Sequence, residues 1–306
     1  MLQKNPNLIV HIGHPKCGST TIQQALFNGS IKVNGDKPLY PTSRINHNYL
    51  RKHIKVYAQE QRILKTNPQD FNLKKISQLL ESEGYANAVI SAEAFSGLEP
   101  KVLLLAMQKF MLPHVNEHTI LCYIRSHASR CISGFAEQTK TGKFVGTIAQ
   151  FHKQATEKRR FACAPKLARW RSTFGDHFKA RPFARDLLLN ESLLDDFSHH
   201  AFEGAEISVQ KMNIQNESLH LEDIVFMRFI QQHIKSPNHK KSQHNAIKLE
   251  IGLHVARALS DKRIKGKGTK IAMDRPLAEE IRKYYLADAQ ELRSEERRVG
   301  KEGRSR

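Results

Sequence analysis

The sequence contains little cysteine. Only four cysteines occur in 306 residues, and none shows the Cys-x-x-Cys spacing of zinc and redox sites. Neither a zinc site nor a disulfide framework is indicated, so Cys17, Cys122, Cys131 and Cys163 are expected to be reduced thiols. No other set of metal ligands is visible in the sequence, and no bound metal is expected.

Long apolar runs are also missing. No stretch approaches the roughly 20 apolar residues that a membrane-spanning helix needs. The first residues, MLQKNPNLIVHIG, have neither the long apolar segment nor the small-residue cleavage site of a secretory signal. We therefore expect a cytoplasmic protein without a membrane span. A composition of 40% hydrophobic and 26% charged residues is typical of a globular protein with a sizeable core.

Acidic residues are few relative to basic ones. Against 49 Lys and Arg stand 30 Asp and Glu, which gives a net charge of +19. Residues 293–306, RSEERRVGKEGRSR, resemble the translated end of a sequencing adapter and are expected to form a non-native, disordered tail. Removing its six basic and three acidic residues leaves +16. Such a charge attracts nucleic acid, anionic membranes, nucleotides or acidic polysaccharides, and net charge alone does not show which of these is the partner.

Short apolar runs alternate with helical segments in the first half of the chain. Strands are predicted at Leu8–Ile12, Ala88–Ile90 and Thr119–Ile124. Helices are predicted directly after Gly18 and at Tyr49–Leu64, Leu73–Glu81 and Lys101–Phe110, and residues 30–50 are expected to form a long loop. This alternation predicts an α/β fold. We expect a single P-loop-type domain over residues 1–292, with a central parallel sheet flanked by helices.

Beyond Ser133 the pattern becomes mainly helical. Helices are predicted at Phe161–Phe174, Leu219–Ile234 and Pro276–Leu292. Phe178–Phe183 is predicted to be a fourth strand, close to a sheet edge because it contains Pro182. The basic run Arg263–Lys270 is expected to be a flexible loop.

A glycine-bounded loop, Gly13-His14-Pro15-Lys16-Cys17-Gly18-Ser19-Thr20, joins the first strand to the first helix. Backbone N–H groups in such a turn converge on an anion, and the helix N-terminus adds positive potential. A nucleotide triphosphatase would carry Lys directly after the second Gly, where Ser19 stands here. Lys16 instead lies inside the loop, which suits a ligand with a 5′-phosphate and a transferable group.

A second phosphate-binding pattern follows the third strand. Arg125 leaves the strand, and Ser133 falls about two turns into the next helix, so a guanidinium and a hydroxyl could hold one phosphate. Because ligands of open α/β sheets bind at the carboxyl ends of strands, the loop and Arg125 are expected at one edge.

Together these motifs resemble the family of sulfotransferases that use 3′-phosphoadenosine 5′-phosphosulfate (PAPS). That family pairs a Pro-Lys-x-Gly-[Ser/Thr]-Thr loop with an Arg and a Ser eight residues apart, as in Pro15–Thr20 and Arg125/Ser133. Arg130 matches a further family arginine, whereas His127 stands where the family usually has Pro. Weaker similarity to bacterial glycan-type members extends over Leu39–Leu50, Ile90–Phe95, Trp170–Asp186 and Arg275–Leu292.

The resemblance implies a role for each motif residue. Arg125 and Ser133 would bind the 3′-phosphate, and the family needs no metal. Lys16 would stabilise the departing phosphate oxygen. Glu93, which follows the second predicted strand, is the candidate base, although a carboxylate at a helix start is an equally simple explanation. The 5′-phosphate side of the donor would be bound by Lys16, Cys17, Gly18, Ser19, Thr20 and Thr21. The implied activity is sulfuryl transfer from PAPS to a hydroxyl or amine, with a carbohydrate as the expected acceptor.

Two other functions remain open. A P-loop nucleotide kinase or NTPase would bind a triphosphate with magnesium, and Ser19 argues against it. A basic nucleic-acid-binding protein would explain the charge but not the Arg125/Ser133 pair, and no nucleic-acid partner is expected. Trp170, the single tryptophan, is predicted to be a core residue, and His47 a solvated loop histidine.

Overall fold

The computed structural model describes residues 5–14, 16–64, 70–82, 84–210, 219–234, 241–261 and 268–293. Pro15 of the loop motif, residues 263–267 of the basic run and residues 294–306 of the tail lie outside the described residues. The chain forms two compact units. The first draws on Met1–Arg125 and Ala164–Asn213, with Leu292 and Arg293, and the second on Ser126–Cys163 and Ile214–Glu291. That residues 1–292 act as one domain stays a prediction.

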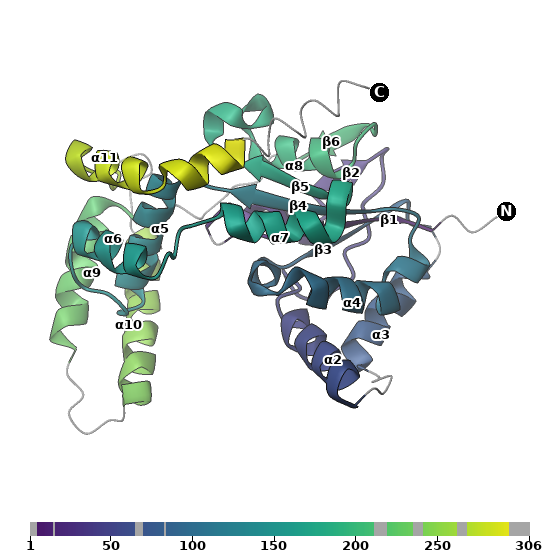
Figure 1. The fold of residues 1–306 in the computed structure, drawn as a ribbon, viewed down its shortest axis with the longest axis horizontal. Helices are drawn as coiled ribbons and strands as arrows, with labels where there is room; N and C mark the ends of the chain where they lie inside the picture. The colour runs from purple at the N-terminus through teal and green to yellow at the C-terminus, as the bar shows by residue number, and fades with distance from the viewer. Residues whose placement is uncertain are drawn as a thin grey trace. The chain divides into compact units, whose positions relative to one another are not determined.

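A four-stranded parallel sheet lies at the centre of the first unit (Figure 1). Its order is β3-β1-β4-β5, with β1 at Asn7–His11, β3 at Asn87–Ser91, β4 at His118–Ile124 and β5 at Phe178–Pro182. Four of the five residues in β1 and in β3 are buried, as expected for parallel strands covered on both faces. The predicted α/β class with a central parallel sheet is confirmed. So is the edge position of the fourth strand, which ends at Pro182.

Two apolar cores cover the two faces of the sheet. On one face, Val10, Ile90 and Ile120 pack in a core that is closed by helices α2 (Leu50–Leu64), α3 (Phe71–Leu80), α4 (Pro100–Phe110) and α7 (Ala164–Phe174). On the other, Ile9, Val89 and Leu121 pack with α1 (Ser19–Phe27) and α8 (Leu193–Ala201). Figure 1 shows α2, α3 and α4 on one side of the sheet and α8 on the other. The predicted helices here are confirmed, and Trp170 is a core residue.

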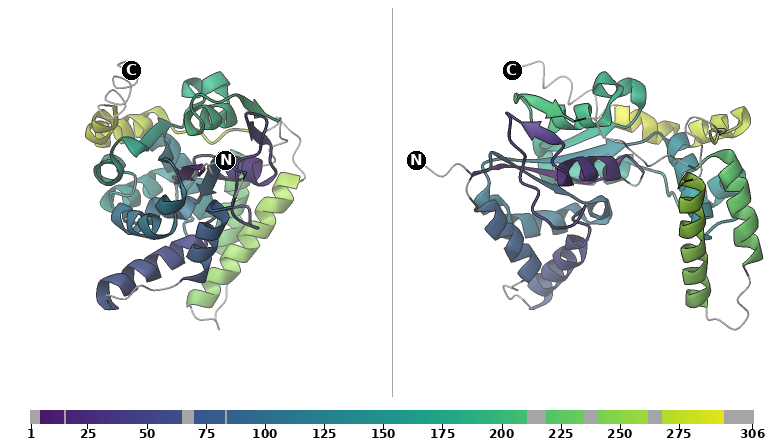
Figure 2. Two further views of the ribbon diagram at one scale, coloured as in Figure 1. Left: turned by 90° about the vertical axis from the view of Figure 1, so that its right-hand side faces the viewer. Right: turned by 180° about the vertical axis from the view of Figure 1, so that it is seen from behind.

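The prediction of a long loop at residues 30–50 is wrong for the first residues of this range. Ile31–Val33 forms β2, which pairs antiparallel with β6 at Ile207–Val209 (Figure 2). Ile31 and Val33 are buried in the second core. Each strand has only three residues, too few to show a period, and its partner is distant in sequence. Local sequence therefore carried no signal for this pair.

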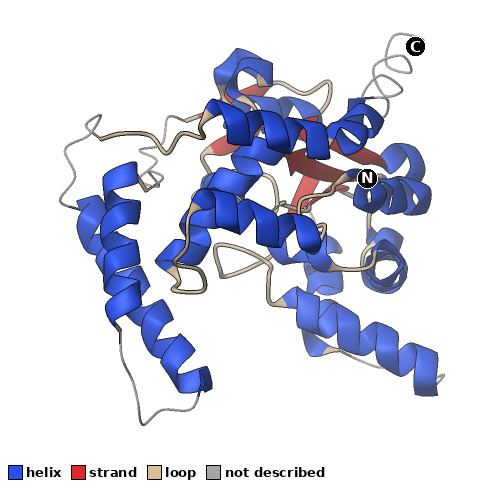
Figure 3. Cartoon of the chain, turned by 60° about the vertical axis from the view of Figure 1, so that its left-hand side comes forward, coloured by secondary structure: helices blue, strands red, loops and turns tan. Residues whose placement is uncertain are grey.

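The second unit is helical in every element that the structure describes (Figure 3). Phe135, Phe151, Ile224 and Ile281 belong to its core. The mainly helical pattern predicted beyond Ser133 is confirmed, although the last predicted helix is interrupted by a turn at Tyr285. The helices are α5 (His127–Lys140), α6 (Ile148–Glu157), α9 (Leu221–His233), α10 (Lys241–Asp261) and α11 (Arg275–Tyr284).

Helix α10 has the apolar period of a strand and was not predicted. Its apolar residues 247, 249, 251, 253 and 255 occur at every second position. Tertiary contacts override this pattern. The Gln231 amide donates to the Lys140 and Lys248 carbonyls, and a side chain at Gly252 would overlap the Lys140 carbonyl oxygen. Close packing at Gly252 therefore places α10 against α5 and α9.

No helix within the described ranges is both long enough and apolar enough to cross a membrane.

Candidate active site

Three loops that carry candidate site residues follow three adjacent strands. β1 lies between β3 and β4 and runs parallel to both, with His11 opposite Ser91 and Leu121. The glycine-bounded loop follows β1, Glu93 follows β3, and Arg125 follows β4. The carboxyl ends of parallel strands meet at one edge, so Lys16, Glu93 and Arg125 belong to the same edge.

The loop after β1 has an unusual backbone. Lys16 and Gly18 both have positive φ, 65° and 74°. Gly18 is the N-cap of α1 and supplies no side-chain hydrogen bond, so the first N–H groups of the helix have no cap of that kind. A non-glycine residue such as Lys16 seldom takes a positive φ, and such residues are frequent at functional sites. The Lys16 side chain is exposed, and so is that of Thr20.

Neither glycine of the loop could carry a side chain. A Cβ at Gly13 would overlap the Ser19 hydroxyl and lie 3.4 Å from the Glu93 Cα. A Cβ at Gly18 would lie 3.0 Å from the Phe183 ring and overlap the Leu193 side chain. The loop is therefore packed tightly on its inner side, against the residue that follows β3.

Two buried side chains of the loop differ in their surroundings. Cys17 is fully buried in the second core, and its N–H donates to the His14 carbonyl at 3.2 Å. The Ser19 hydroxyl is also buried, and within the described residues it has no hydrogen-bond partner. A buried polar atom without a partner is costly, so the Ser19 hydroxyl is suited to accept or donate to a bound anion. Thr21, in the first turn of α1, is half-buried.

Arg125 is held close to this loop by an aromatic ring. Its guanidinium carbon lies 4.7 Å from the centre of the Phe183 ring, the same ring that blocks the Cβ position of Gly18. Burial lowers the pKa of Arg125, and the neighbouring Cys17 thiol acts in the opposite direction. The side chain stays cationic at neutral pH, because an arginine pKa lies far above 7.

A buried carboxylate supports the wall that Phe183 and Leu193 form. Asp196 of α8 accepts hydrogen bonds from the Tyr123 hydroxyl (2.7 Å), the Arg181 guanidinium (2.8 Å) and the Leu189 N–H (3.1 Å). Burial raises its pKa, but these hydrogen bonds and the charge of Arg181 outweigh burial and lower it. Sequence inspection missed Phe183, Leu193 and Asp196, because each acts through contacts with residues distant in the chain.

Glu93 is the first residue of a short 3₁₀ helix, Glu93–Gly97, and is half-buried. Its carbonyl accepts from the Ser96 hydroxyl at 2.9 Å, and the next N–H, of Ala94, donates to the Asn48 side chain at 2.9 Å. The backbone on both sides of the carboxylate is therefore fixed. Its place at a helix start leaves the stabilising explanation as open as the catalytic one.

The prediction that His47 is a solvated loop histidine is wrong. Its ring is fully buried, 4.7 Å from the Tyr40 ring. Its Nδ1 accepts the Ser91 N–H at 3.2 Å, and its own N–H donates to the Ser91 carbonyl at 2.9 Å. His11 Nδ1 is 2.8 Å from the Ser91 hydroxyl. Burial lowers the pKa of His47 to about 4 and that of His11 to about 3, so both are neutral at pH 7.

The remaining motif residues lie in the second unit. Ser133 is half-buried in α5, and its sharing of a phosphate with Arg125 stays a prediction. Arg130 donates to the Phe161 carbonyl at 2.6 Å and contacts the Cys163 sulfur. His127 occupies the first position of α5, a position that also favours Pro. It pairs with Asp288 at 2.7 Å.

All four cysteines are buried and free. Over the described part of the chain, no three His, Cys, Asp or Glu side chains gather in a way that could hold a metal ion.

The chain matches no model of a known protein family and no curated protein. Among solved structures it is similar to a sulfotransferase from Alicyclobacillus acidocaldarius, with 12% sequence identity, 94% of each chain covered and a TM-score of 0.45.

The buried His47 predicts a specific pH dependence of stability. Unfolded, the ring takes up a proton near its ordinary pKa of 6.5, whereas the folded ring resists protonation down to about 4. The stabilisation is complete above pH 6.5 and is lost as the pH falls toward 4. His47→Gln removes the titration and keeps a side-chain acceptor for the Ser91 N–H. Between pH 7 and 4 its unfolding free energy should fall by roughly 3 kcal/mol less than that of the wild type.

Chemical denaturation at a series of pH values measures this difference. His254→Gln, which changes an exposed histidine, is the control and should follow the wild type. If His47→Gln and the wild type lose stability in parallel, the assignment of a buried neutral His47 is wrong.

Proposed function

We propose that this protein is a sulfotransferase that moves a sulfuryl group from PAPS to a hydroxyl or amine of a carbohydrate. One observation carries the proposal: the glycine-bounded loop with Lys16, the carboxylate of Glu93 and the guanidinium of Arg125 follow three adjacent parallel strands. An anion cradle, a proton acceptor and a second cation are the groups that sulfuryl transfer from a bisphosphorylated nucleotide requires.

Three features of the loop in this chain suit a 5′-phosphosulfate group. Gly13 and Gly18 place no side chain at either end of the turn, and the buried Ser19 hydroxyl has no partner within the described residues. The N-terminus of α1 adds N–H groups and positive potential. We infer that Gly18, Ser19 and Thr20 bind the 5′-phosphate, with Cys17 and Thr21 completing the turn on either side.

Each candidate residue then has a distinct task. PAPS would supply the activated sulfuryl group, whose bond to the bridging phosphate oxygen breaks as the acceptor oxygen or nitrogen bonds to sulfur. Lys16 would neutralise the negative charge that grows on that departing oxygen. Glu93 would take the proton from the acceptor group. Arg125 would bind the 3′-phosphate. Ser133 is assigned to the same phosphate only because it follows Arg125 by eight residues.

Binding of the desulfated product tests the proposal. We expect 3′-phosphoadenosine 5′-phosphate to bind more tightly than ATP, and without magnesium, because the two phosphate-binding groups follow separate strands. Calorimetric titrations of both nucleotides, with and without magnesium, measure this. Tighter, magnesium-dependent binding of ATP would favour a nucleotide kinase, and preferential binding of DNA or RNA a nucleic-acid-binding protein.

Arg125→Ala should weaken 3′-phosphoadenosine 5′-phosphate by roughly 10- to 100-fold, because a charge-assisted hydrogen bond to the 3′-phosphate is lost. Adenosine 5′-phosphate, which lacks that group, should bind nearly as before. Arg185→Ala is the control, since Arg185 is an exposed arginine of the same unit whose side chain pairs with Glu191. Equal losses for both nucleotides would show that Arg125 does not bind the 3′-phosphate.

Glu93→Gln separates catalysis from helix stabilisation. A base should lose turnover by roughly 10²- to 10⁴-fold, with little change in nucleotide binding. If Glu93 only stabilises the helix start, the substitution should instead lower stability by about 0.3–1 kcal/mol and leave turnover intact. Turnover with radiolabelled PAPS and a glycan panel, beside a thermal melt, gives both values. The exposed Glu206→Gln serves as control, and wild-type turnover in Glu93→Gln would remove Glu93 from the mechanism.

A further inference from the structure

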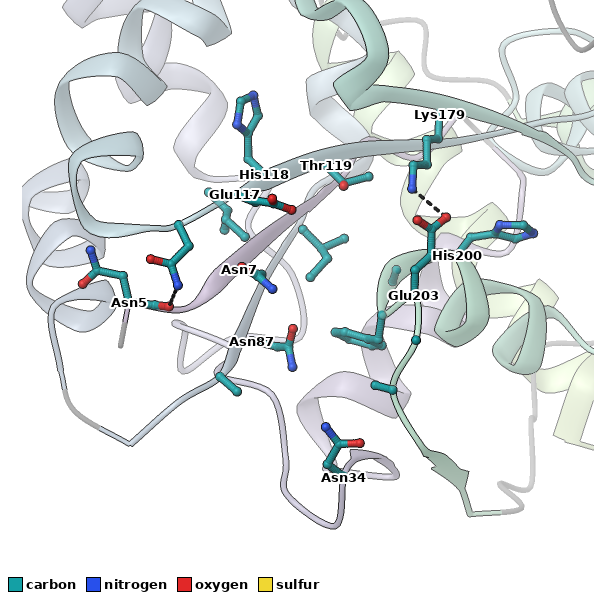
Figure 4. Close-up of a pocket in the computed structure, with 18 residues that line it drawn as sticks. Asn5, Asn7, Asn34, Asn87, Glu117, His118, Thr119, Lys179, His200 and Glu203 are labelled. Carbon is teal, nitrogen blue, oxygen red and sulfur yellow. Dashed lines mark hydrogen bonds and ion pairs between the residues drawn. The ribbon is translucent and has the colours of Figure 1, made fainter. Parts of the chain in front are cut away.

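A second concave region of the first unit lies at the opposite edge of the sheet from the loop. It is a pocket of about 330 Å³ lined by the first residues of three strands, Asn7 of β1, Asn87 of β3 and His118 of β4 (Figure 4). Lys179 of β5 and residues 200–205, which follow the body of α8, line its other side. Its volume falls in the range of small-ligand sites, about 300–1,000 Å³. None of the residues assigned above to the phosphate loop lines it.

Asparagine is the most frequent polar residue of the lining. Five asparagines contribute, and two of them, Asn7 and Asn87, are direct partners in the register of adjacent strands. Figure 4 shows these two amides side by side, with Asn34 nearby on another element. The Asn34 side chain accepts a hydrogen bond from the Glu206 N–H at 2.9 Å, and the Asn116 side chain donates one to the Asn5 carbonyl at 2.6 Å. These two side chains are therefore used to fix the backbone around the pocket. The side-chain amides of Asn7 and Asn87 make no hydrogen bond to any described residue.

The pocket carries almost no net charge. Lys179 is the single lysine or arginine of the lining, and its ammonium group lies 2.7 Å from a carboxylate oxygen of Glu203. Burial is the main cause that lowers the pKa of His118 and of His200 to about 4, so both rings are neutral at pH 7. Glu117 leaves a single formal negative charge. In a chain of net charge +19, this region therefore does not attract phosphate or sulfate groups.

Two apolar residues of the lining, Ile9 and Phe202, belong to the second core, and both are almost completely buried. Phe202 is fixed by an edge-on contact with the Phe197 ring, 6.3 Å between centres. Because little of either side chain is accessible, a ligand would meet mainly the polar residues, and the paired amides of Asn7 and Asn87 suit a ligand with several hydroxyls. Each amide can donate to one hydroxyl and accept from another, which a carboxylate or an ammonium cannot do.

We propose that this pocket binds an uncharged, polyhydroxylated ligand, a neutral sugar unit of a glycan, at a site separate from the phosphate loop. Asn7 and Asn87 bind the hydroxyls, and the buried side chains of Ile9 and Phe202 lie beneath them. The site does not depend on the proposed sulfuryl transfer, since it shares no residue with that machinery.

Calorimetric titration of the full chain with maltotriose and with chitotriose, in the absence of any nucleotide, tests the proposal. We expect saturable binding of at least one of these neutral trisaccharides. Asn87→Leu, which keeps the size but removes the hydrogen-bonding groups, should weaken binding about 3- to 10-fold, and Asn7→Leu by a similar factor. Asn245→Leu changes an exposed asparagine of α10 and should bind like the wild type.

A thermal melt identifies a variant that fails to fold, and Asn7→Leu and Asn87→Leu serve as independent checks on each other. Both should retain the binding of 3′-phosphoadenosine 5′-phosphate, because the pocket lies at the other edge of the sheet. No saturable sugar binding, or equal sugar binding by wild type and both variants, would overturn the proposal. Tighter binding of spermidine, lost in Asn7→Leu and Asn87→Leu, would overturn it as well, in favour of a cationic ligand.

Discussion

The parallel pairing of β1 with β3 on one side and β4 on the other is the constraint on which the candidate active site depends. Both faces of these strands are covered by apolar cores, so a polar side chain that must meet a ligand has to lie at or beyond an end of the strand. Three such ends lie at one edge, and they carry Lys16, Glu93 and Arg125. A shift in the order of the strands would separate these groups even if every local motif remained.

The shape of the loop after β1 depends in turn on residues that never enter the motif. Gly18 packs on Phe183 and Leu193, and Phe183 also contacts Arg125. Both apolar residues are held near the Asp196 carboxylate, which is fully buried and bonded to Tyr123 and Arg181. Removal of Arg181 would leave the buried Asp196 charge with less compensation, although the cost is smaller than for a fully buried pair because the Arg181 side chain is 28% exposed. The anion cradle and the second cation are therefore supported by one shared ring and by one ion pair with a buried carboxylate.

The sequence predicted those parts of the fold whose signals are local. The strands β1, β3 and β4 are short apolar runs, and the glycines of the loop stand at positions where a Cβ would collide. The parts that were missed depend on distant partners. β2 is buried only because β6 and the second core cover it, and His47 is buried only because Ser91 accepts and donates hydrogen bonds to its backbone and ring. Helix α10 even has the period of a strand, and its contacts with Lys140 and Gln231 override that period.

Net charge alone does not distinguish between the two proposed ligands, and the two edges of the sheet show why. At the carboxyl edge, Lys16, Arg125 and the N-terminus of α1 concentrate positive potential where an anion can approach the backbone. At the amino edge, Lys179 is neutralised by Glu203, and the lining consists largely of amides and neutral rings. A field of +19 spread over the whole chain acts on both edges alike. Any discrimination between an anionic nucleotide and a neutral sugar must therefore come from groups within a few ångströms of each ligand.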